Sequence, residues 1–227
     1  MKDFKCRCSA IGQIMTNDRS GKQMGKTAQS YCETWIKEQL YNSKKEFSSK
    51  QTQKGNECED NSIDFFADYF GLGMLMKNEQ YYENDFITGT PDVVLPEHII
   101  DLKNSWDCFT FPLFDNEIPN KDYEWQLQGY MWLTGRMNAK LVYVLSDTPA
   151  HLIEKEAYYW CKANGYDEMD MDIYHKFAER MTYKDTPANL KIKVFAFARD
   201  EEKIKAIQER VLLCREYVNE LLTKIKL

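Results

Sequence analysis

The pattern of apolar residues along the chain predicts an α/β fold, an α+β sandwich in which helices flank a central mixed β-sheet. Stretches with apolar residues three and four apart, typical of amphipathic helices, alternate with short β-branched or alternating runs, typical of strands. Their order is helix, three strands, helix, strand, a helical excursion, strand and helix. The strand runs are residues 81–89, 91–95, 98–104, 140–146 and 191–198.

The N-terminal part of the chain is predicted to hold helices joined by polar segments. Residues 9–16 are expected to form a short helix and residues 17–25 a polar loop. Residues 42–54, rich in Ser, Lys and Gln, are predicted to be flexible, and a helix should follow over residues 55–70. A helix over 26–41 is supported by apolar residues at helical spacing, namely Ala28, Tyr31, Cys32, Trp35, Ile36 and Leu40.

The C-terminal half holds three further helical predictions. Residues 121–134 should form a helix that stops at Gly135, a residue type suited to a helix end, and residues 149–189 a mainly helical insertion. The last helix should begin near Asp200, a good N-cap residue. Its heptad spacing fits either a coiled-coil partner or packing across the sheet, and with only three heptads packing across the sheet is favoured.

Length and composition indicate one packed domain over residues 1–227, with the insertion at about 149–189. The 227 residues are 43% hydrophobic and 14% aromatic, which excludes a disordered chain. No apolar run approaches the roughly 20 residues of a membrane span, and the first residues lack the apolar core of a secretion signal. Seven scattered cysteines without a CxxC pair argue against a zinc or iron–sulfur site and favour reduced thiols in a cytoplasmic protein.

Charge is unevenly distributed along the chain. The net charge is −6, yet residues 1–54 hold 11 Lys/Arg against 5 Asp/Glu, while the remainder holds 19 against 31. A basic N-terminal lobe on an acidic body can bind a phosphate backbone while the acidic groups build a metal site. A solvated charge asymmetry without any partner accounts for these numbers equally well.

The most informative stretch is residues 89–103, GTPDVVLPEHIIDLK, with two carboxylates and a lysine at the ends of two apolar runs. Strand alternation places Asp101 and Lys103 on one face, and a turn at 96–98 would pair the strands and bring Asp92 near Asp101. A hard cation such as Mg²⁺ usually neutralises carboxylates that converge in this way, and a neighbouring lysine can orient an attacking water. The stretch predicts phosphodiester hydrolysis. The alternative is a pair of surface acids on an ordinary hairpin.

With a preceding acidic helix and the run from Gln126 to Tyr130, this stretch resembles the PD-(D/E)xK nuclease superfamily, specifically the phage lambda exonuclease and YqaJ-type viral recombinase group. The segment CSAIGQIMT near the N-terminus is similar to the helix that begins these domains. The resemblance implies a restriction-endonuclease-like core and covers most of the chain apart from about 149–189. The matching residues are Pro91-Asp92, Asp101-Leu102-Lys103 and Gln126-Leu127-Gln128-Gly129-Tyr130.

The resemblance further implies a glutamate from the first long helix at the metal site, and Glu57, Glu59 and Asp60 are the candidates. Glu59 is in helical register with the apolar residues Ile63 and Phe66, whereas Glu57 is in register with polar residues. The inward-facing Glu59 is therefore the predicted ligand.

The function implied is a metal-dependent DNA exonuclease that degrades one strand of linear double-stranded DNA, 5′→3′, for phage-type recombination. Asp92, Asp101 and the carbonyl of Leu102 would hold Mg²⁺, with Mn²⁺ as a substitute. Glu59 would complete that shell or bind a second ion, and Lys103 would orient the resulting hydroxide.

DNA contacts are expected at two places. Gln126 and Tyr130 lie four residues apart on one helical face, which the resemblance places beside the active site and the DNA. Arg7 and Ser9 offer a guanidinium and a hydroxyl for a terminal 5′-phosphate, as the N-terminal segment does in lambda-type enzymes.

The resemblance also implies an assembly, since the lambda-type relatives are ring-shaped homotrimers that thread DNA ends and work with a single-strand annealing protein. No membrane is expected to be involved.

The same residues are compatible with three alternative functions. An endonuclease would share the site, and a RecB-like nuclease would add a four-cysteine cluster that the spacing here does not offer. A nuclease-dead DNA-binding module would have no reason to keep the full set of acids and Lys103.

Overall fold

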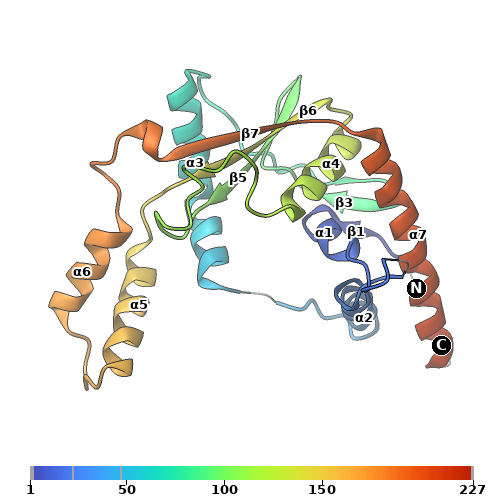
Figure 1. Ribbon diagram of the computed structural model, residues 1–227, viewed down its shortest axis with the longest axis horizontal. Helices are drawn as coiled ribbons and strands as arrows, with labels where there is room; N and C mark the ends of the chain where they lie inside the picture. The colour runs from blue at the N-terminus through green and yellow to red at the C-terminus, as the bar shows by residue number, and fades with distance from the viewer. Residues whose placement is uncertain (1–2, 22, 47, 226–227) are drawn as a thin grey trace.

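The computed structural model describes residues 3–21, 23–46 and 48–225, whose helices surround two β-sheets (Figure 1). The larger sheet has the order β4-β5-β6-β7. β5 and β6 are parallel, and the other two pairs are antiparallel. The predicted mixed sheet flanked by helices is thus confirmed. Its strands are β4 Val93–Val94, β5 His98–Asn104, β6 Asn138–Val144 and β7 Ile192–Ala198.

A second, smaller sheet contains what the sequence predicts as one strand over 81–89. Its order is β1-β3-β2, with β1 Cys6–Arg7, β2 Tyr82–Glu83 and β3 Ile87–Gly89. The single-strand prediction was wrong because Asn84 makes a turn: its side-chain oxygen accepts the N–H groups of Phe86 and Ile87 at 2.8 and 2.9 Å. β1 was not predicted, since two residues are too few to show a period.

Seven α-helices lie in the described ranges, together with the 3-10 helices η1 Cys8–Ala10 and η2 Ala188–Leu190. The α-helices are α1 Ile11–Ile14, α2 Lys26–Leu40, α3 Lys50–Phe70, α4 Asp122–Thr134, α5 Ala150–Ala163, α6 Met171–Met181 and α7 Glu201–Lys224. Two hydrophobic cores lie on the two faces of the larger sheet, one shared with α1, α2, α4 and α7 and the other with α3. Strand β5 serves both cores, because Ile99 faces the larger one and Ile100 and Leu102 face the smaller one.

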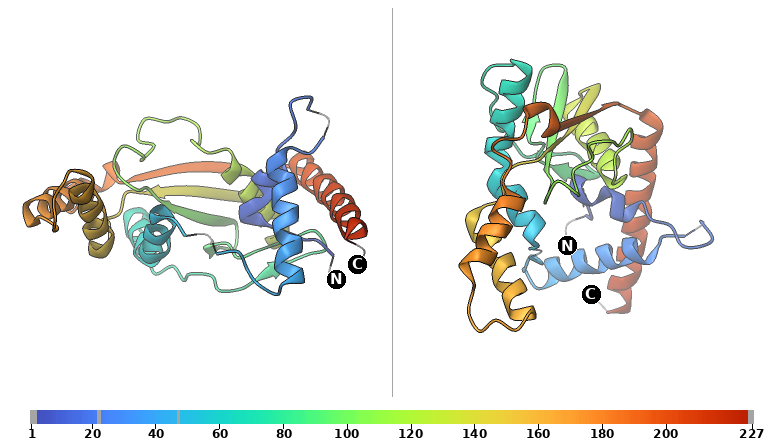
Figure 2. Two further views of the ribbon diagram at one scale, coloured as in Figure 1. Left: turned by 90° about the horizontal axis from the view of Figure 1, so that it is seen from below. Right: turned by 60° about the vertical axis from the view of Figure 1, so that its left-hand side comes forward.

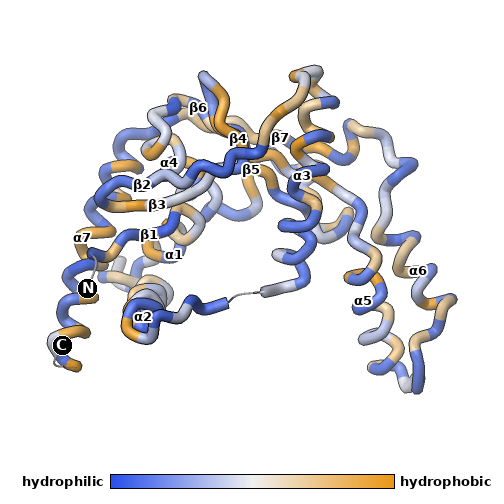
Figure 3. The backbone as a smooth tube through the Cα atoms, turned by 180° about the vertical axis from the view of Figure 1, so that it is seen from behind, coloured by the Kyte–Doolittle hydropathy of each residue, from blue (hydrophilic) through white to orange (hydrophobic). Residues whose placement is uncertain are grey.

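Helix α3 covers the face of the smaller core and begins five residues earlier than the predicted 55–70. Ser49 caps it, because its Oγ accepts the N–H of Thr52 at 3.1 Å. The prediction that residues 42–54 are flexible is therefore wrong for 50–54. The first turns of α3 are hydrophilic and its later turns carry the apolar residues (Figure 3), so periodicity alone did not reveal the start.

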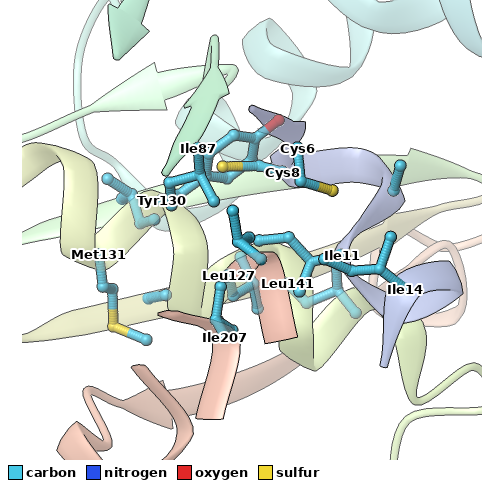
Figure 4. Close-up of a cluster of buried hydrophobic side chains, with 14 of the residues drawn as sticks. Cys6, Cys8, Ile11, Ile14, Ile87, Leu127, Tyr130, Met131, Leu141 and Ile207 are labelled. Atoms are coloured by element: carbon cyan, nitrogen blue, oxygen red, sulfur yellow. The ribbon is translucent and has the colours of Figure 1, made fainter. Parts of the chain in front are cut away.

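The larger core lies where α1, α2, α4 and α7 meet the opposite face (Figure 4). The heptad face of α7 is buried there by Ile207, Val211 and Cys214. It packs on α2, α4 and α1 and not across the sheet as predicted. Gly129 lets α1 approach α4 closely, since an added Cβ would fall 2.6 Å from the Ile11 Cδ1 atom.

Helices α5 and α6 project from the body as a helical hairpin (Figures 1 and 2). They pack on each other around a small core of Ala157, Cys161 and Ile173. In the described part of the chain, none of the helices is both long and apolar enough to cross a membrane.

Candidate active site

Strand β5 carries Asp101 and Lys103 on the face of the larger core. Asp101 is 1% exposed, and both its oxygens are engaged. Lys103 Nζ lies 2.6 Å from Oδ2, and Gln126 Nε2 donates a hydrogen bond of 3.1 Å to Oδ1. The carboxylate is thus held between a cation and an amide at the centre of the fold.

Asp92 reaches this point because the hairpin of β4 and β5 folds as its sequence predicts. Val93 pairs with Ile100 in the antiparallel hairpin. Asp92, the residue before Val93, lies next to this pair, and its Oδ2 atom accepts the N–H of Leu102 at 2.7 Å. The N–H and C=O of one strand residue point to the same side, so the Leu102 carbonyl faces the same space. Burial and the charge of Asp101 raise the pKa of Asp92 to about 8, against the opposing effects of Lys103 and the Leu102 N–H.

Lys103 stays protonated at neutral pH. Burial disfavours its charge, but the carboxylates of Asp101 and Asp92 outweigh that effect, so its pKa is raised. The ammonium also lies 4.8 Å from the centre of the Tyr123 ring, and Tyr123 packs edge-on against Tyr143. Lys103 is therefore a fixed cation between a carboxylate and an aromatic ring.

Helix α4 supplies the residues that surround this pair. Gln126 donates a second hydrogen bond, of 3.0 Å, to the Tyr130 hydroxyl, and both side chains are buried. Their contacts are with Asp101 and with each other, so the expected DNA contact stays a prediction. Gly89 accommodates Tyr130, because a Cβ there would fall 2.7 Å from its ring. Tyr123 was missed, although its spacing of three from Gln126 places it on the same helical face.

Glu59 lies on α3 with its side chain 22% exposed and paired with Lys77, whose Nζ is 3.0 Å from Oε2. Its charge contributes to the raised pKa of Asp92, after burial and the charge of Asp101. The rejected candidate Glu57 is more exposed and pairs with His151 at 3.3 Å. Lys77 was not foreseen, since nothing in its local sequence marks it.

Arg7 and Ser9 are exposed, while Cys6 and Cys8 between and beside them are buried. Strand β1 pairs with β3 so that Arg7 lies opposite Thr88, in the segment that leads to Asp92. The Arg7 backbone N–H contacts the Tyr31 hydroxyl at 3.5 Å. A role of Arg7 and Ser9 in phosphate binding stays a prediction.

The donors at this site suit a hard divalent cation. Two carboxylates and the Leu102 carbonyl face one space beside the ammonium of Lys103. Burial and the charge of Asp101 raise the pKa of Asp92, so a bound cation would stabilise its carboxylate form. The Cys8 thiol is buried, and this burial raises its pKa well above the usual range. Across the described ranges, no three His, Cys, Asp or Glu side chains are grouped so as to hold a metal. Of the three predicted acidic ligands, Glu59 is the one that pairs with a lysine outside this site, Lys77.

Two acids on an antiparallel strand pair, a lysine two residues after the second acid and a glutamine on the next helix together define the class of PD-(D/E)xK nucleases. Comparison with solved structures agrees. A phage-related exonuclease from Haemophilus somnus 129PT is 31% identical, with a TM-score of 0.81 over 98% of this chain and 97% of that chain. The chain belongs to this family of phage-related, lambda-exonuclease-like nucleases.

More distant structures share the fold. The alkaline exonuclease LHK-Exo from Laribacter hongkongensis is 15% identical, with a TM-score of 0.68 over 98% of this chain and 91% of that chain. LHK-Exo in complex with dAMP is 17% identical, with a TM-score of 0.67 over 98% of this chain and 93% of that chain. No protein-family model matches the sequence, and no curated protein does.

Proposed function

We propose that the protein is a Mg²⁺-dependent exonuclease that degrades one strand of linear duplex DNA from its end, with 5′→3′ polarity. The observation that carries the proposal is the convergence of Asp92 and Asp101 beside the protonated Lys103. The 31% identical relative is described as a phage-related exonuclease, which supports the reaction class. Arg7 and Ser9 are exposed, and Arg7 lies opposite Thr88 in the segment that leads to Asp92, which supports recognition of a 5′ end.

The protein's own groups divide the chemistry between them. Asp92, Asp101 and the Leu102 carbonyl would hold Mg²⁺ or Mn²⁺, with Glu59 completing the shell. When bound, the ion lowers the pKa of a water ligand and offsets charge on the phosphate. Lys103 donates hydrogen bonds that orient the attacking water and stabilise the pentacovalent phosphorane. The carboxylates of Asp101 and Asp92 raise the pKa of Lys103, so its proposed role is that of a hydrogen-bond donor.

Gln126 and Tyr130 support this arrangement from the protein interior, where both side chains are buried. The amide of Gln126 fixes the rotation of the Asp101 carboxylate, which a metal ligand requires. Their helical face continues toward Tyr123 and the ammonium of Lys103. We expect the scissile strand to pass over this side of the site.

We extend the proposal to the assembly. A homotrimer around the duplex would hold the enzyme on its substrate, and a single-strand annealing protein would receive the exposed strand. Both act in the host cytoplasm in this proposal. Sedimentation of the purified protein tests the trimer separately from the chemistry.

The test is digestion of a linear duplex labelled at the 5′ or the 3′ end, in Mg²⁺ and in EDTA, with closed-circular duplex as the endonuclease control. Degradation of the linear form alone, from the 5′ end and only with Mg²⁺, is expected. Asp92→Ala and Asp101→Asn should abolish it with the fold intact, whereas Asp115→Asn, an exposed acid of the loop after β5, should not. Near-normal turnover by either site variant would show that the altered aspartate is not a metal ligand. Cleavage of the closed-circular duplex would show that the protein is an endonuclease.

A further inference from the structure

Lys77 is a cation beside the site that the reaction described above does not use. Gly71 ends α3 with a φ of 63°, and the chain then continues without a helix or strand until Tyr82. This segment carries Lys77 back to α3, where Nζ lies 3.0 Å from Glu59 and 3.3 Å from Asp60. A lysine from outside the helix thus bridges two successive acids.

The segment is fixed to the backbone of the metal site. The Asn78 N–H donates to the carbonyl of Asp92 at 2.7 Å, and its side-chain amide donates to the carbonyl of Pro91 at 2.9 Å. Lys77 is therefore tethered one residue from a contact with the predicted metal ligand. Its ammonium can change partner, but its backbone stays beside Asp92.

Glu59 is linked to Asp92 through the segment that carries Lys77 and Asn78. Its charge contributes to the raised pKa of Asp92, yet its carboxylate faces Lys77. Among the described residues no three acids are grouped as a metal site. In this arrangement the predicted third acid has Lys77 as its partner.

We propose that Lys77 is a positioning residue that controls metal loading: it neutralises Glu59 in the metal-free protein and must release it when a divalent cation binds at Asp92 and Asp101. This inference rests on the proposed function, because it presumes a divalent cation at that site. It adds a residue, and an exchange of one counter-ion for another, to the chemistry described above.

The second acid makes the exchange easy. Asp60 is 78% exposed and also contacts Lys77, so the ammonium keeps a carboxylate partner after Glu59 leaves. The ion pair that is lost is partly exposed, with Lys77 at 40% and Glu59 at 22%. Pairs of this kind hold their partners only weakly, which corresponds to a change in affinity of about two- to fivefold.

The experiment is calorimetric titration of Mn²⁺ alone into chelator-treated protein, without DNA. Four proteins form a double-mutant cycle: wild type, Lys77→Met, Glu59→Gln and the double variant. Lys77→Met should bind Mn²⁺ about two- to fivefold more tightly, because the competitor for Glu59 is gone. Glu59→Gln should bind more weakly, and adding Lys77→Met to it should change nothing further.

Two controls separate this exchange from general electrostatics. Lys77→Arg keeps the charge and should stay near the wild-type affinity. Lys5→Met removes a comparable exposed ion pair, Lys5–Glu83 at 3.1 Å, in the smaller sheet, and should leave Mn²⁺ binding unchanged.

The outcomes separate the role of Lys77 from the proposed function. If the wild type binds Mn²⁺ but Lys77→Met binds it equally well, the role of Lys77 is wrong and the proposed function stands. The role of Lys77 is also wrong if Lys77→Met tightens binding by the same factor in the Glu59→Gln background, since the effect would then not pass through Glu59. If the wild type binds no Mn²⁺, both the metal-dependent function and the exchange fall.

Discussion

Replacing Lys54 by methionine should change how the stability of the protein depends on pH. Lys54 is fully buried in α3, and its Nζ donates to the Trp106 carbonyl at 2.9 Å, in the loop that follows the catalytic strand. Burial lowers its pKa from 10.5 to about 8, against smaller opposing effects of Cys58, Asp107 and Asp147. In the unfolded chain the side chain keeps its ordinary pKa.

The sign follows from counting protons. Below pH 8 both states carry the proton, and above pH 10.5 neither does. Between these values the unfolded chain binds more protons, so the free energy of unfolding rises with pH. A change from 10.5 to about 8, at about 1.4 kcal/mol per pH unit, corresponds to about 3 kcal/mol across that window.

The assay is urea unfolding of wild type and Lys54→Met from pH 7.5 to 10.5. Tyrosines and cysteines also titrate in this range, but they do so in both proteins, and the difference between the two curves isolates Lys54. The wild type should gain about 3 kcal/mol relative to the variant as pH rises. Lys50→Met controls for the loss of a lysine from the same helix. Parallel curves for wild type and Lys54→Met would refute the reasoning.

Further predictions concern the active site. Lys103→Ala should keep DNA affinity but lose about 100- to 1,000-fold in single-turnover rate; a change in affinity alone would make it a phosphate anchor. Tyr123→Leu should slow turnover about two- to fivefold by removing the ring beside Lys103, and Tyr123→Phe should restore most of it. Arg7→Ala should shrink the preference for a 5′-phosphorylated over a 5′-hydroxyl duplex, about tenfold to a hundredfold in initial rates, and equal wild-type rates would contradict end recognition. Gln126→Ala should slow both substrates alike.

The part of the site that could be predicted depends only on residues close to one another in the sequence. Alternation over residues 98–104 assigned Asp101 and Lys103 to one face, and the turn before it fixed which strand would bring Asp92. These inferences need only strand period and hairpin closure, which act over a few residues. The inward orientation of Glu59 over Glu57 followed from helical period in the same way.

The rest depends on partners distant in the sequence. Lys54 lies in a polar run that is typical of a flexible segment, yet it is buried and donates to the carbonyl of Trp106, a residue 52 positions further along the chain. The pairing of Lys77 with Glu59 requires a loop whose course is set by Asn78 and Asp92. Helix α7 was correctly assigned as a helix, but its packing partners include an N-terminal helix at the other end of the chain. The periodicity of apolar residues within a short stretch of sequence does not indicate contacts between segments that are far apart in the chain.

The shared core of the two chain ends has a consequence for synthesis on the ribosome. Phe4 packs in the same core as Val211, and Arg215 in α7 donates to the carbonyl of Phe4 at 3.0 Å. The N-terminal segment emerges first, yet its apolar side chains have no complete cover until α7 follows. The nascent chain therefore carries an exposed apolar surface from the synthesis of Phe4 until that of α7, and a product that stops short of α7 should be recognised by chaperones or proteases.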